Sequence, residues 1–434
     1  MLRRQFLGGA GVAVGATALV GGTKAAAAAG TKAEPIAAAD WTAFRDLFPL
    51  TRDYVQLSTF LIASHPKPVS DAIAKIRQAL DENPSDFLKN AFPARDYGVQ
   101  AAAARYMGGE QHQYALTDST TMGLAMVYSG LKLSIGDEIL QTEHEHYSSD
   151  MSLEFGSRRS GATIRKIALY EEASAFTEED CVQRLQNAIA DKTRVVAVTW
   201  VHSSSGVKLP IRAMADVIDA VNANREPDQQ IIFCVDGVHG LGIENQDVSK
   251  LGCDFFIGGT HKWIFGPRGT GIVWGSDRGW QRCEAIIPSF SASTYVWRGL
   301  IAQDQVPVGA HMSPGGFHSF EHRWALPAAF DLHLALGKDN VQRRIHQLNT
   351  QSKEGLAKMT HVKLHTPMAA AYSSGFACFE VDGISPPDVV KKMHDKGVIM
   401  SNSPYRKSFA RFAPSLLNNE QEIDQALAGI AALA

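Results

Sequence analysis

The chain has 434 residues, of which 45% are hydrophobic and 20% charged, and its formal net charge is −3. This length exceeds what one hydrophobic core usually organises, so we expect at least two structural units in a soluble globular protein. The nearly balanced charge excludes the basic surface typical of nucleic-acid-binding proteins. No apolar run is long enough for a transmembrane helix in the mature protein.

Residues 1–29 have the features of a secretory signal peptide: a basic start, a weakly apolar run rich in Gly and Ala, and an alanine tract suited to signal peptidase. Arg3 and Arg4, followed by Gln-Phe-Leu, resemble the twin-arginine export motif. An ordinary Sec signal with two chance arginines is the alternative. We expect the twin-arginine machinery to export the folded protein to the periplasm, with cleavage near residue 29, so a cofactor can be loaded in the cytoplasm.

From residue 66 to about residue 277, short apolar strands alternate with helices. The expected strands are 137–141, 193–200, 230–235, 254–259 and 269–274, and the expected helices include 69–80, 120–130 and 212–222. Continuous apolar strands separated by helices predict a mainly parallel sheet covered by helices on both faces, which is the α/β class. We assign this large domain to residues 66–310.

The end of the chain has a different pattern, which predicts a smaller α+β domain over residues 311–434. Segment 30–65 is expected to pack on it, because both flank the large domain in the sequence. The elements expected in the small domain are an edge-region strand over 374–381, a helix over 386–396 and a closing helix over 419–433.

The cysteines form no Cys-x-x-Cys pair, and most have apolar neighbours. We therefore expect buried free thiols and no disulfide framework, despite the oxidising destination. The five are Cys181, Cys234, Cys253, Cys283 and Cys378.

In an open parallel sheet, ligands bind at the carboxyl ends of the strands, so the residues that follow each strand are the candidates for a site. Thr120, Thr121 and the backbone of Met122 begin a helix after a short strand segment at Tyr114. Free N–H groups and hydroxyls at a helix start suit a phosphate. Taken alone, the same pattern also fits a plain N-cap.

Histidines and small polar residues follow the next two strands. His144 and His146 could bind a metal, lie against an aromatic cofactor, or simply be surface residues. No further set of ligands at metal spacing accompanies them, so we predict no metal site. After strand 193–200, His202 and Ser203 could donate a hydrogen bond to a ligand oxygen, which is a weak signal by itself.

Asp236 and Lys262 each follow a strand that reads as buried. A buried carboxylate is costly without a cationic partner, and burial lowers the pKa of a lysine, whose neutral amine can then form a Schiff base with an aldehyde. Taken alone, an N-cap and a surface-loop lysine are the simpler interpretations. A phosphate cradle, a carboxylate for a ring nitrogen and an imine-forming amine, on consecutive strand ends, are together the parts needed for pyridoxal 5′-phosphate.

The stretch that begins Asp-Gly-Val-His at residue 236 and continues to Thr-His-Lys-Trp at residues 260–263 resembles the class V aminotransferase family of fold-type I pyridoxal enzymes. Within it, the isopenicillin N epimerase-like branch has these patterns at similar spacing. The similarity extends from about Leu57 to the C-terminus. It implies a seven-stranded-type sheet in the large domain, pyridoxal 5′-phosphate as the cofactor, and a homodimer.

The resemblance also assigns roles to residues of this chain. It implies that Lys262 forms the Schiff base, that Asp236 pairs with the ring nitrogen, and that Arg411 binds the substrate α-carboxylate. The other implied roles are phosphate binding by Thr120, Thr121, Met122 and His261, stacking on the ring by His144 or alternatively His146, contact with the ring hydroxyl by Ser203 or His202, and a place beside the ring for His239.

The chain departs from the family pattern at three places. In one of them, Ala413 and Leu417 replace the Ser and Tyr of the family's C-terminal signature. In segment 315–327, where relatives often have a Gly-Thr that reaches the neighbouring subunit, His322 and Arg323 are present. Arg323 is therefore a candidate for binding substrate or phosphate. Ser203 stands where relatives usually have Asn, which weakens its assignment.

Fold alone does not choose among transamination, racemisation, elimination and desulfuration. Desulfurases of the family carry a nucleophilic cysteine in the loop before the carboxylate-binding arginine, and residues 397–411 contain none, which argues against desulfuration. We expect chemistry at the α-carbon of an amino acid or an amino-acid-containing metabolite. An aminotransferase-like enzyme is the leading interpretation; epimerisation and C–S lysis are the alternatives, and a ligand-binding module is the non-enzymatic one. A periplasmic enzyme that tailors pyoverdine-type siderophores is similar in combining a twin-arginine signal with this fold.

Overall fold

A computed structural model of the chain describes residues 40–290 and 293–434. The predicted signal peptide over residues 1–29, and the first part of segment 30–65, lie outside the described residues. No helix in the described part of the chain is both long enough and apolar enough to cross a membrane.

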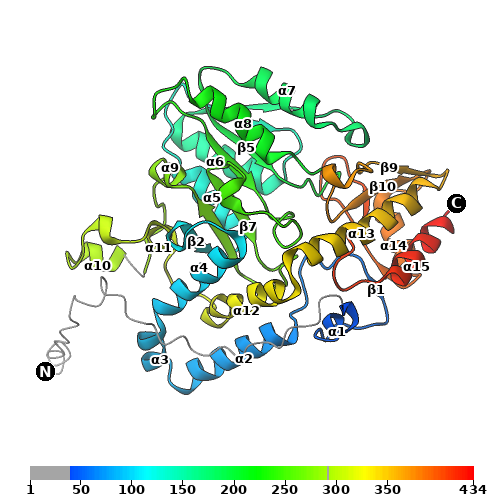
Figure 1. Cartoon of the computed structure of the whole chain (residues 1–434), viewed down its shortest axis with the longest axis horizontal. Coiled ribbons are helices and arrows are strands. Elements are labelled where there is room, and N and C mark those ends of the chain that lie inside the picture. Colours follow the sequence, from blue (N-terminus) through cyan, green and yellow to red (C-terminus); the bar gives the residue numbers. More distant parts are fainter. Residues whose placement is uncertain (1–39, 291–292) are drawn as a thin grey trace, which may run out of the picture. The chain divides into compact units, whose positions relative to one another are not determined.

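A seven-stranded sheet lies at the centre of the large domain (Figure 1). Neighbouring strands from β7 through β6, β5 and β3 to β4 are parallel, while β8 runs antiparallel to both β7 and β2. Residues 260–270 join β7 to β8 without a crossover helix, which is why this pair is antiparallel. The predicted α/β fold with a mainly parallel sheet is confirmed. The strand order is β2 (Tyr114–Thr117), β8 (Gly271–Gly275), β7 (Phe255–Gly259), β6 (Ile232–Asp236), β5 (Thr193–Thr199), β3 (Glu138–Thr142), β4 (Thr163–Ile167).

Helices bury both faces of this sheet. Val196 and Phe233 belong to one hydrophobic cluster, whereas their chain neighbours Val195 and Cys234 belong to the other. Successive strand residues point to opposite faces, so inner strands such as β6 and β7 are buried at every position. The helices of this part of the chain are α2 (Lys67–Glu82), α3 (Pro84–Ala91), α4 (Ala94–Met107), α5 (Thr120–Gly130), α6 (Tyr147–Ser160), α7 (Glu178–Ala188), α8 (Ile211–Asn222), α9 (Asp277–Gln281), α10 (Ser293–Trp297), α11 (Val308–Met312) and α12 (Phe320–Leu336).

The C-terminal part contains a four-stranded antiparallel sheet with its own hydrophobic cluster. The prediction of an edge strand over 374–381 is wrong, because β10 pairs with β13 on one side and β9 on the other. Ala377, Cys378 and Phe379 are fully buried there, as an internal strand requires. The elements are α13 (Lys338–Ala357), β9 (Val362–Leu364), β10 (Ala377–Val381), α14 (Pro386–His394), β11 (Val398–Ile399), β12 (Ser401–Asn402), β13 (Ala410–Phe412) and α15 (Glu420–Ala431).

The N-terminal segment contacts the C-terminal part at several points. Strand β1 (Val55–Gln56) pairs with β11 in parallel, and Arg45 at the end of α1 (Trp41–Arg45) forms an ion pair with Glu422 at 2.5 Å. Helix α12, which we placed in the small domain, packs on α2 and α4 of the large domain. The domain boundary near residue 310 stays a prediction.

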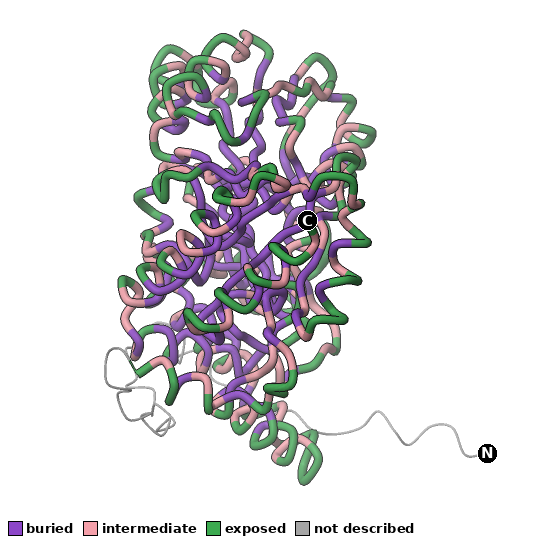
Figure 2. The backbone as a smooth tube through the Cα atoms, turned by 90° about the vertical axis from the view of Figure 1, so that its right-hand side faces the viewer, coloured by how far each residue is buried: buried purple, intermediate pink, exposed green. Residues whose placement is uncertain are grey.

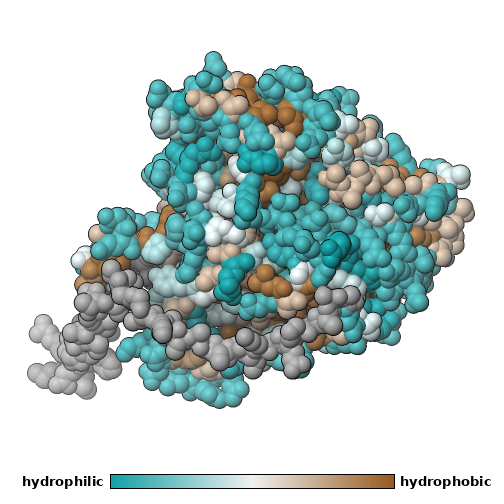
Figure 3. Space-filling model, viewed as in Figure 1, coloured by the Kyte–Doolittle hydropathy of each residue, from teal (hydrophilic) through white to brown (hydrophobic). Residues whose placement is uncertain are grey.

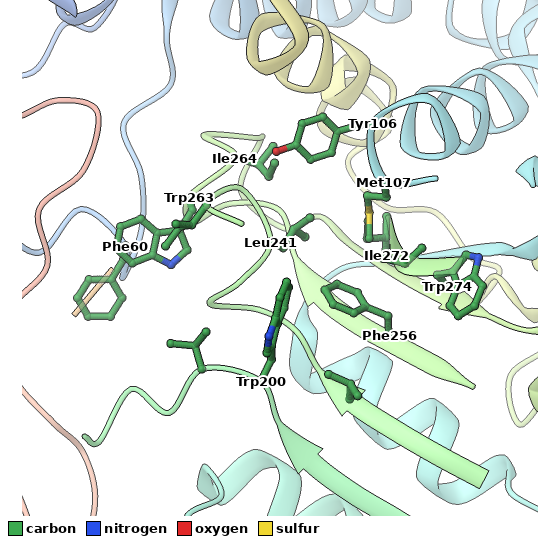
Figure 4. Packing of buried hydrophobic residues seen from close by; sticks show 14 of the residues in the cluster. Phe60, Tyr106, Met107, Trp200, Leu241, Phe256, Trp263, Ile264, Ile272 and Trp274 are labelled. Atoms are coloured by element: carbon green, nitrogen blue, oxygen red, sulfur yellow. The ribbon is translucent and has the colours of Figure 1, made fainter. Parts of the chain in front are cut away.

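Buried residues gather in the interior of the described chain, and exposed residues lie along its outer turns and helices (Figure 2). All five cysteines are buried and free, as expected. In the core beneath the β7–β8 connection, Phe60 stacks on Trp263 with 5.8 Å between ring centroids, and Trp200 packs edge-on against Phe256 (Figure 4). These aromatic contacts anchor the segment that carries Lys262.

Candidate active site

The candidate residues collect at the carboxyl end of the parallel sheet. Asp236 is the last residue of β6, Lys262 follows β7, Thr120 opens α5 after β2, and His146 caps α6 after β3. Ser203 follows β5 in the same way. Parallel strands end at a common edge, so residues distant in sequence meet there.

Lys262 and Asp236 lie in the same buried site, as their predicted roles toward one cofactor require. Asp236 is 3% exposed, and burial raises its pKa to about 6 against the lowering effects of the Val238 N–H and the Lys262 charge. Burial likewise lowers the pKa of Lys262 to about 8, partly opposed by Asp236 and reinforced by Arg411. A substantial fraction of this amine is therefore neutral near pH 8, and only the neutral form is a nucleophile.

The turn after Lys262 is fixed by aromatic packing. Phe265 has a φ of 57°, a left-handed conformation that is uncommon for a bulky residue. Its buried ring packs edge-on against Phe48 at 5.1 Å and lies 5.9 Å from Phe44. These contacts hold the strained backbone and keep the lysine at the end of β7.

His239 is the immediate neighbour of the amine. Its Nε2 lies 3.5 Å from Nζ of Lys262, and its Nδ1 accepts a hydrogen bond from Trp263 Nε1 at 3.2 Å. Burial, with the nearby Lys262 charge, lowers the pKa of His239 well below its usual value. The ring is therefore neutral, and because Nδ1 accepts, the proton is on Nε2. An Nε2–H that faces Lys262 favours the uncharged, hydrogen-bond-accepting amine.

The start of α5 has the character of an anion site. The Ser119 hydroxyl accepts from the Met122 N–H at 3.1 Å, so that donor is occupied. Thr120 Oγ1 is buried and has no hydrogen-bond partner among the described residues, and Thr121 is exposed. A Cβ built at Gly259 would lie 2.8 Å from Thr120 Oγ1 and 3.0 Å from His261 Cε1. One point at the N-terminus of α5 is thus surrounded by the end of β7, the Thr120 hydroxyl and the His261 imidazole. This arrangement fits a phosphate.

The two histidines after β3 have different surroundings. Burial lowers the pKa of His146 to about 4, and the charges of Lys262 and Arg411 add to that effect. His144 instead stacks on Tyr170, with ring centroids 3.8 Å apart and planes nearly parallel. The structure therefore places His146 beside Lys262 and Arg411, and covers one face of His144 with a tyrosine.

His202 and Ser203 also have different surroundings. His202 is fully buried, with Nδ1 2.9 Å from the Tyr170 hydroxyl. Ser203 faces the C-terminal part: its carbonyl accepts from Arg411 Nη1 at 2.7 Å, and its Oγ lies 3.0 Å from the Tyr405 hydroxyl.

Arg411 is a buried cation on β13, 2% exposed, whose Nε donates to Ser401 Oγ at 2.9 Å. Its guanidinium lies over the ring of Phe60, 4.7 Å from the centroid. Arg323 differs, because it lies 3.2 Å from Asp118 and 3.7 Å from Asp96. Two carboxylates thus neutralise Arg323. Its contacts therefore do not support the predicted role in binding substrate or phosphate.

The aminotransferase class-V family model matches residues 65–403 of the chain. The chain belongs to the class-V aminotransferase family.

Relatives and solved structures agree with this. The isopenicillin N epimerase of Streptomyces clavuligerus is 26% identical over 350 residues, covering 80% of this chain and 85% of the relative. A probable cysteine desulfurase of Halalkalibacterium halodurans is 24% identical over 327 residues, covering 72% and 76%. A lysine mutant of C-DES with glycine covalently linked to its PLP cofactor superposes with a TM-score of 0.79 at 22% identity, covering 89% of this chain and 98% of C-DES.

The cofactor of this class-V enzyme is pyridoxal 5′-phosphate, and the residues present fit it. When bound, it supplies an electron sink for a substrate α-carbon. Lys262 Nζ would hold its aldehyde and move a proton, while Asp236 would keep the ring nitrogen protonated. The open Thr120 hydroxyl would receive the phosphate. Among the described residues, no group of three or more His, Cys, Asp and Glu side chains is placed to hold a metal ion.

Sequence reasoning missed Glu145, a buried carboxyl between the two histidines. It accepts hydrogen bonds from Thr142 Oγ1 at 2.6 Å and Thr199 N at 3.0 Å, and it also bonds the Thr199 hydroxyl. Burial raises the pKa of Glu145 to about 7, and the Asp236 charge adds to this. Glu145 therefore ties the turn that carries His146 to the end of β5 in this class-V enzyme.

Replacing Glu145 by alanine is expected to lower the free energy of unfolding by about 1–3 kcal/mol, because the Thr199 N–H loses its buried acceptor. Glutamine keeps an acceptor and should be tolerated. Since the folded-state pKa is raised, ionisation of Glu145 costs stability as pH rises through 7, so the glutamine variant should match or exceed the wild type at pH 8. Thermal unfolding of both variants at pH 8 measures this, and equal losses in both would contradict it.

Proposed function

We propose that this class-V enzyme breaks the Cα–H bond of a free or metabolite-borne amino acid, with transamination as its leading reaction. The observation that carries the proposal is that Lys262, Asp236 and Arg411 share one site. Arg411 would bind the substrate carboxylate, and Lys262 would take the α-proton and return it. The neutral imidazole of His239 keeps the amine able to accept that proton.

Desulfuration has no support from the thiols of the chain. The loop before Arg411 carries Tyr405 and no cysteine. Cys378 pairs with Arg411 across the β10–β13 ladder, but it is fully buried, and burial raises its pKa to about 11. A thiol in that state is a poor nucleophile.

Epimerisation is the second candidate, and the similarity to two isopenicillin N epimerases favours it. An epimerase must return the proton to the other face of the α-carbon, which requires a second group besides Lys262. The candidates are His146, on which the charges of Lys262 and Arg411 act, and Tyr405, whose ring centroid lies 5.8 Å from that of His146.

Spectroscopy in deuterated solvent distinguishes the two reactions. Purified enzyme loaded with cofactor would be mixed with a panel of L- and D-amino acids. A transaminase is expected to bleach the visible cofactor band and release a 2-oxo acid, whereas an epimerase retains the band, incorporates deuterium and racemises the substrate. If no member of a broad panel exchanges its α-proton or changes the band, the proposed function is wrong.

Export by the twin-arginine route is part of the same proposal. Arg3 and Arg4 support it, as do five buried free cysteines, the state expected of thiols that fold in a reducing compartment. Replacing both arginines by lysine is expected to leave the protein in the cytoplasmic fraction, because the twin-arginine route requires the arginines themselves. A Sec signal requires only positive charge and would still work with lysine. Periplasmic accumulation of the double lysine variant would show ordinary Sec export instead. A siderophore side chain as the substrate stays a prediction from resemblance.

A homodimer is also proposed, and exposed apolar side chains support it. Figure 3 shows separate brown patches on a mostly hydrophilic face, and exposed apolar side chains that gather on a surface mark interaction sites. The large exposed ones between residues 286 and 317 are Ile286, Ile287, Phe290, Tyr295, Trp297, Leu300 and Phe317.

A further inference from the structure

Tyr405 and Arg411 belong to one rigid hairpin. Arg411 lies on β13 and pairs in register with Ser401 of β12, and Tyr405 lies in the turn between the two strands. Ser403 and Phe409 close this turn with two hydrogen bonds of 2.9 Å, one between backbones and one to the serine hydroxyl. The hairpin therefore fixes the tyrosine relative to the arginine.

Both side chains meet the large domain at Ser203. Arg411 binds the Ser203 carbonyl, and the Tyr405 hydroxyl lies 3.0 Å from Ser203 Oγ. The Tyr405 ring stands edge-on to His146. The charges of Glu145, Arg411 and Asp236 all act on its hydroxyl. Tyr405 thus lies among the charged groups of the active site, although nothing in its sequence motif marks it.

Each of the two side chains retains an unused donor. Arg411 commits Nε to Ser401 and Nη1 to Ser203, while Nη2 makes no hydrogen bond to a described residue. Burial raises the pKa of Tyr405 well above its usual value, so its hydroxyl stays protonated. When the Ser203 hydroxyl donates to the phenol oxygen, the phenol proton is available to a ligand.

We propose that the Tyr405 hydroxyl and Nη2 of Arg411 bind the substrate carboxylate together, one donor to each oxygen. The assignment rests on the proposed function, because it requires a substrate with a carboxylate at this arginine. It makes Tyr405 a specificity-determining residue that favours free acids over amides and esters. A neutral donor beside the cation adds a hydrogen bond to an ionised acceptor, which is stronger than one between neutral groups.

The test compares Tyr405→Phe with the wild type on an amino acid and on its carboxamide, following the change in the cofactor band. Loss of a hydrogen bond to a carboxylate is expected to raise the apparent Kd of the acid about ten- to a hundredfold. The amide, which lacks the anion, should change by about twofold at most. Tyr54→Phe is the matched control, because Tyr54 packs against His394 and its hydroxyl bonds no described residue.

Equal losses for acid and amide would assign Tyr405 a structural role, and unchanged affinity for both would remove it from the site; either result overturns the proposal. Ser203→Ala supplies a second reading if Tyr405→Phe does not fold. It loosens the tyrosine and should weaken acid binding by about two- to tenfold while sparing the amide. If the wild type responds to no amino acid, the proposed function has failed. If the wild type responds to amino acids and Tyr405→Phe binds the acid as tightly as the wild type does, only the role of Tyr405 is refuted.

Discussion

Replacing Lys262 by alanine is expected to lower turnover by about two to four orders of magnitude, the usual contribution of a positioned acid–base group. Lys262 is the amine whose pKa is lowered by burial and which faces the neutral Nε2–H of His239. No other lysine lies in the β7–β8 connection over residues 260–270, so this segment offers no second amine. The measurement is kcat with the best substrate of the panel, on protein shown to retain cofactor phosphorus.

Lys250→Ala is the matched control for loss of an amine, since the Lys250 side chain is 80% exposed and makes only a long ion pair with Asp247. It should keep wild-type turnover. Added small primary amines should restore part of the activity of Lys262→Ala by supplying the missing base. An alanine variant within tenfold of the wild type would contradict the assignment of Lys262.

The second large effect is expected for Asp236→Asn, which preserves shape and removes charge. The carboxylate is buried and accepts from the Val238 N–H at 3.1 Å, which orients it at the end of β6. An amide cannot hold a proton on the ring nitrogen, so the electron sink weakens. Turnover should fall by about a hundred- to a thousandfold, the scale of losing one preorganised electrostatic contact.

The control for Asp236→Asn is Asp254→Asn, another buried carboxylate of the same sheet region. Asp254 is 2% exposed and paired with Arg278 at 2.8 Å, away from the site. Its variant should lose stability and leave the position of the cofactor band unchanged. Asp236→Asn should shift that band with little loss of stability. The reverse pattern would show that Asp236 is structural.

The central strands could be predicted from the sequence because burial on both faces of the sheet produces runs of consecutive apolar residues. Val195 and Val196 point to opposite faces and are both apolar, so strand β5 could be predicted without coordinates. The edge-strand prediction for residues 374–381 failed because pairing partners are set by tertiary contacts that no local pattern encodes.

The residues of the candidate site also fall into those that the sequence could predict and those that it could not. Residues at strand ends, such as Asp236 and Lys262, could be found from position alone, because parallel strands share an edge. Glu145 and Tyr405 could not, since their partners Thr199 and Ser203 lie about 54 and 202 residues away in the chain. A polar residue between two histidines and a tyrosine in a turn carry no local signal of burial.

The whole site depends on a bond between the Lys262 amine and the cofactor aldehyde, and borohydride trapping detects that bond. Enzyme loaded with pyridoxal 5′-phosphate would be reduced with borohydride, digested and examined by peptide mass spectrometry. We expect a single stable pyridoxyl adduct on Lys262, together with loss of the visible band. An adduct on any other lysine, or a colourless protein that takes up no label, would contradict it.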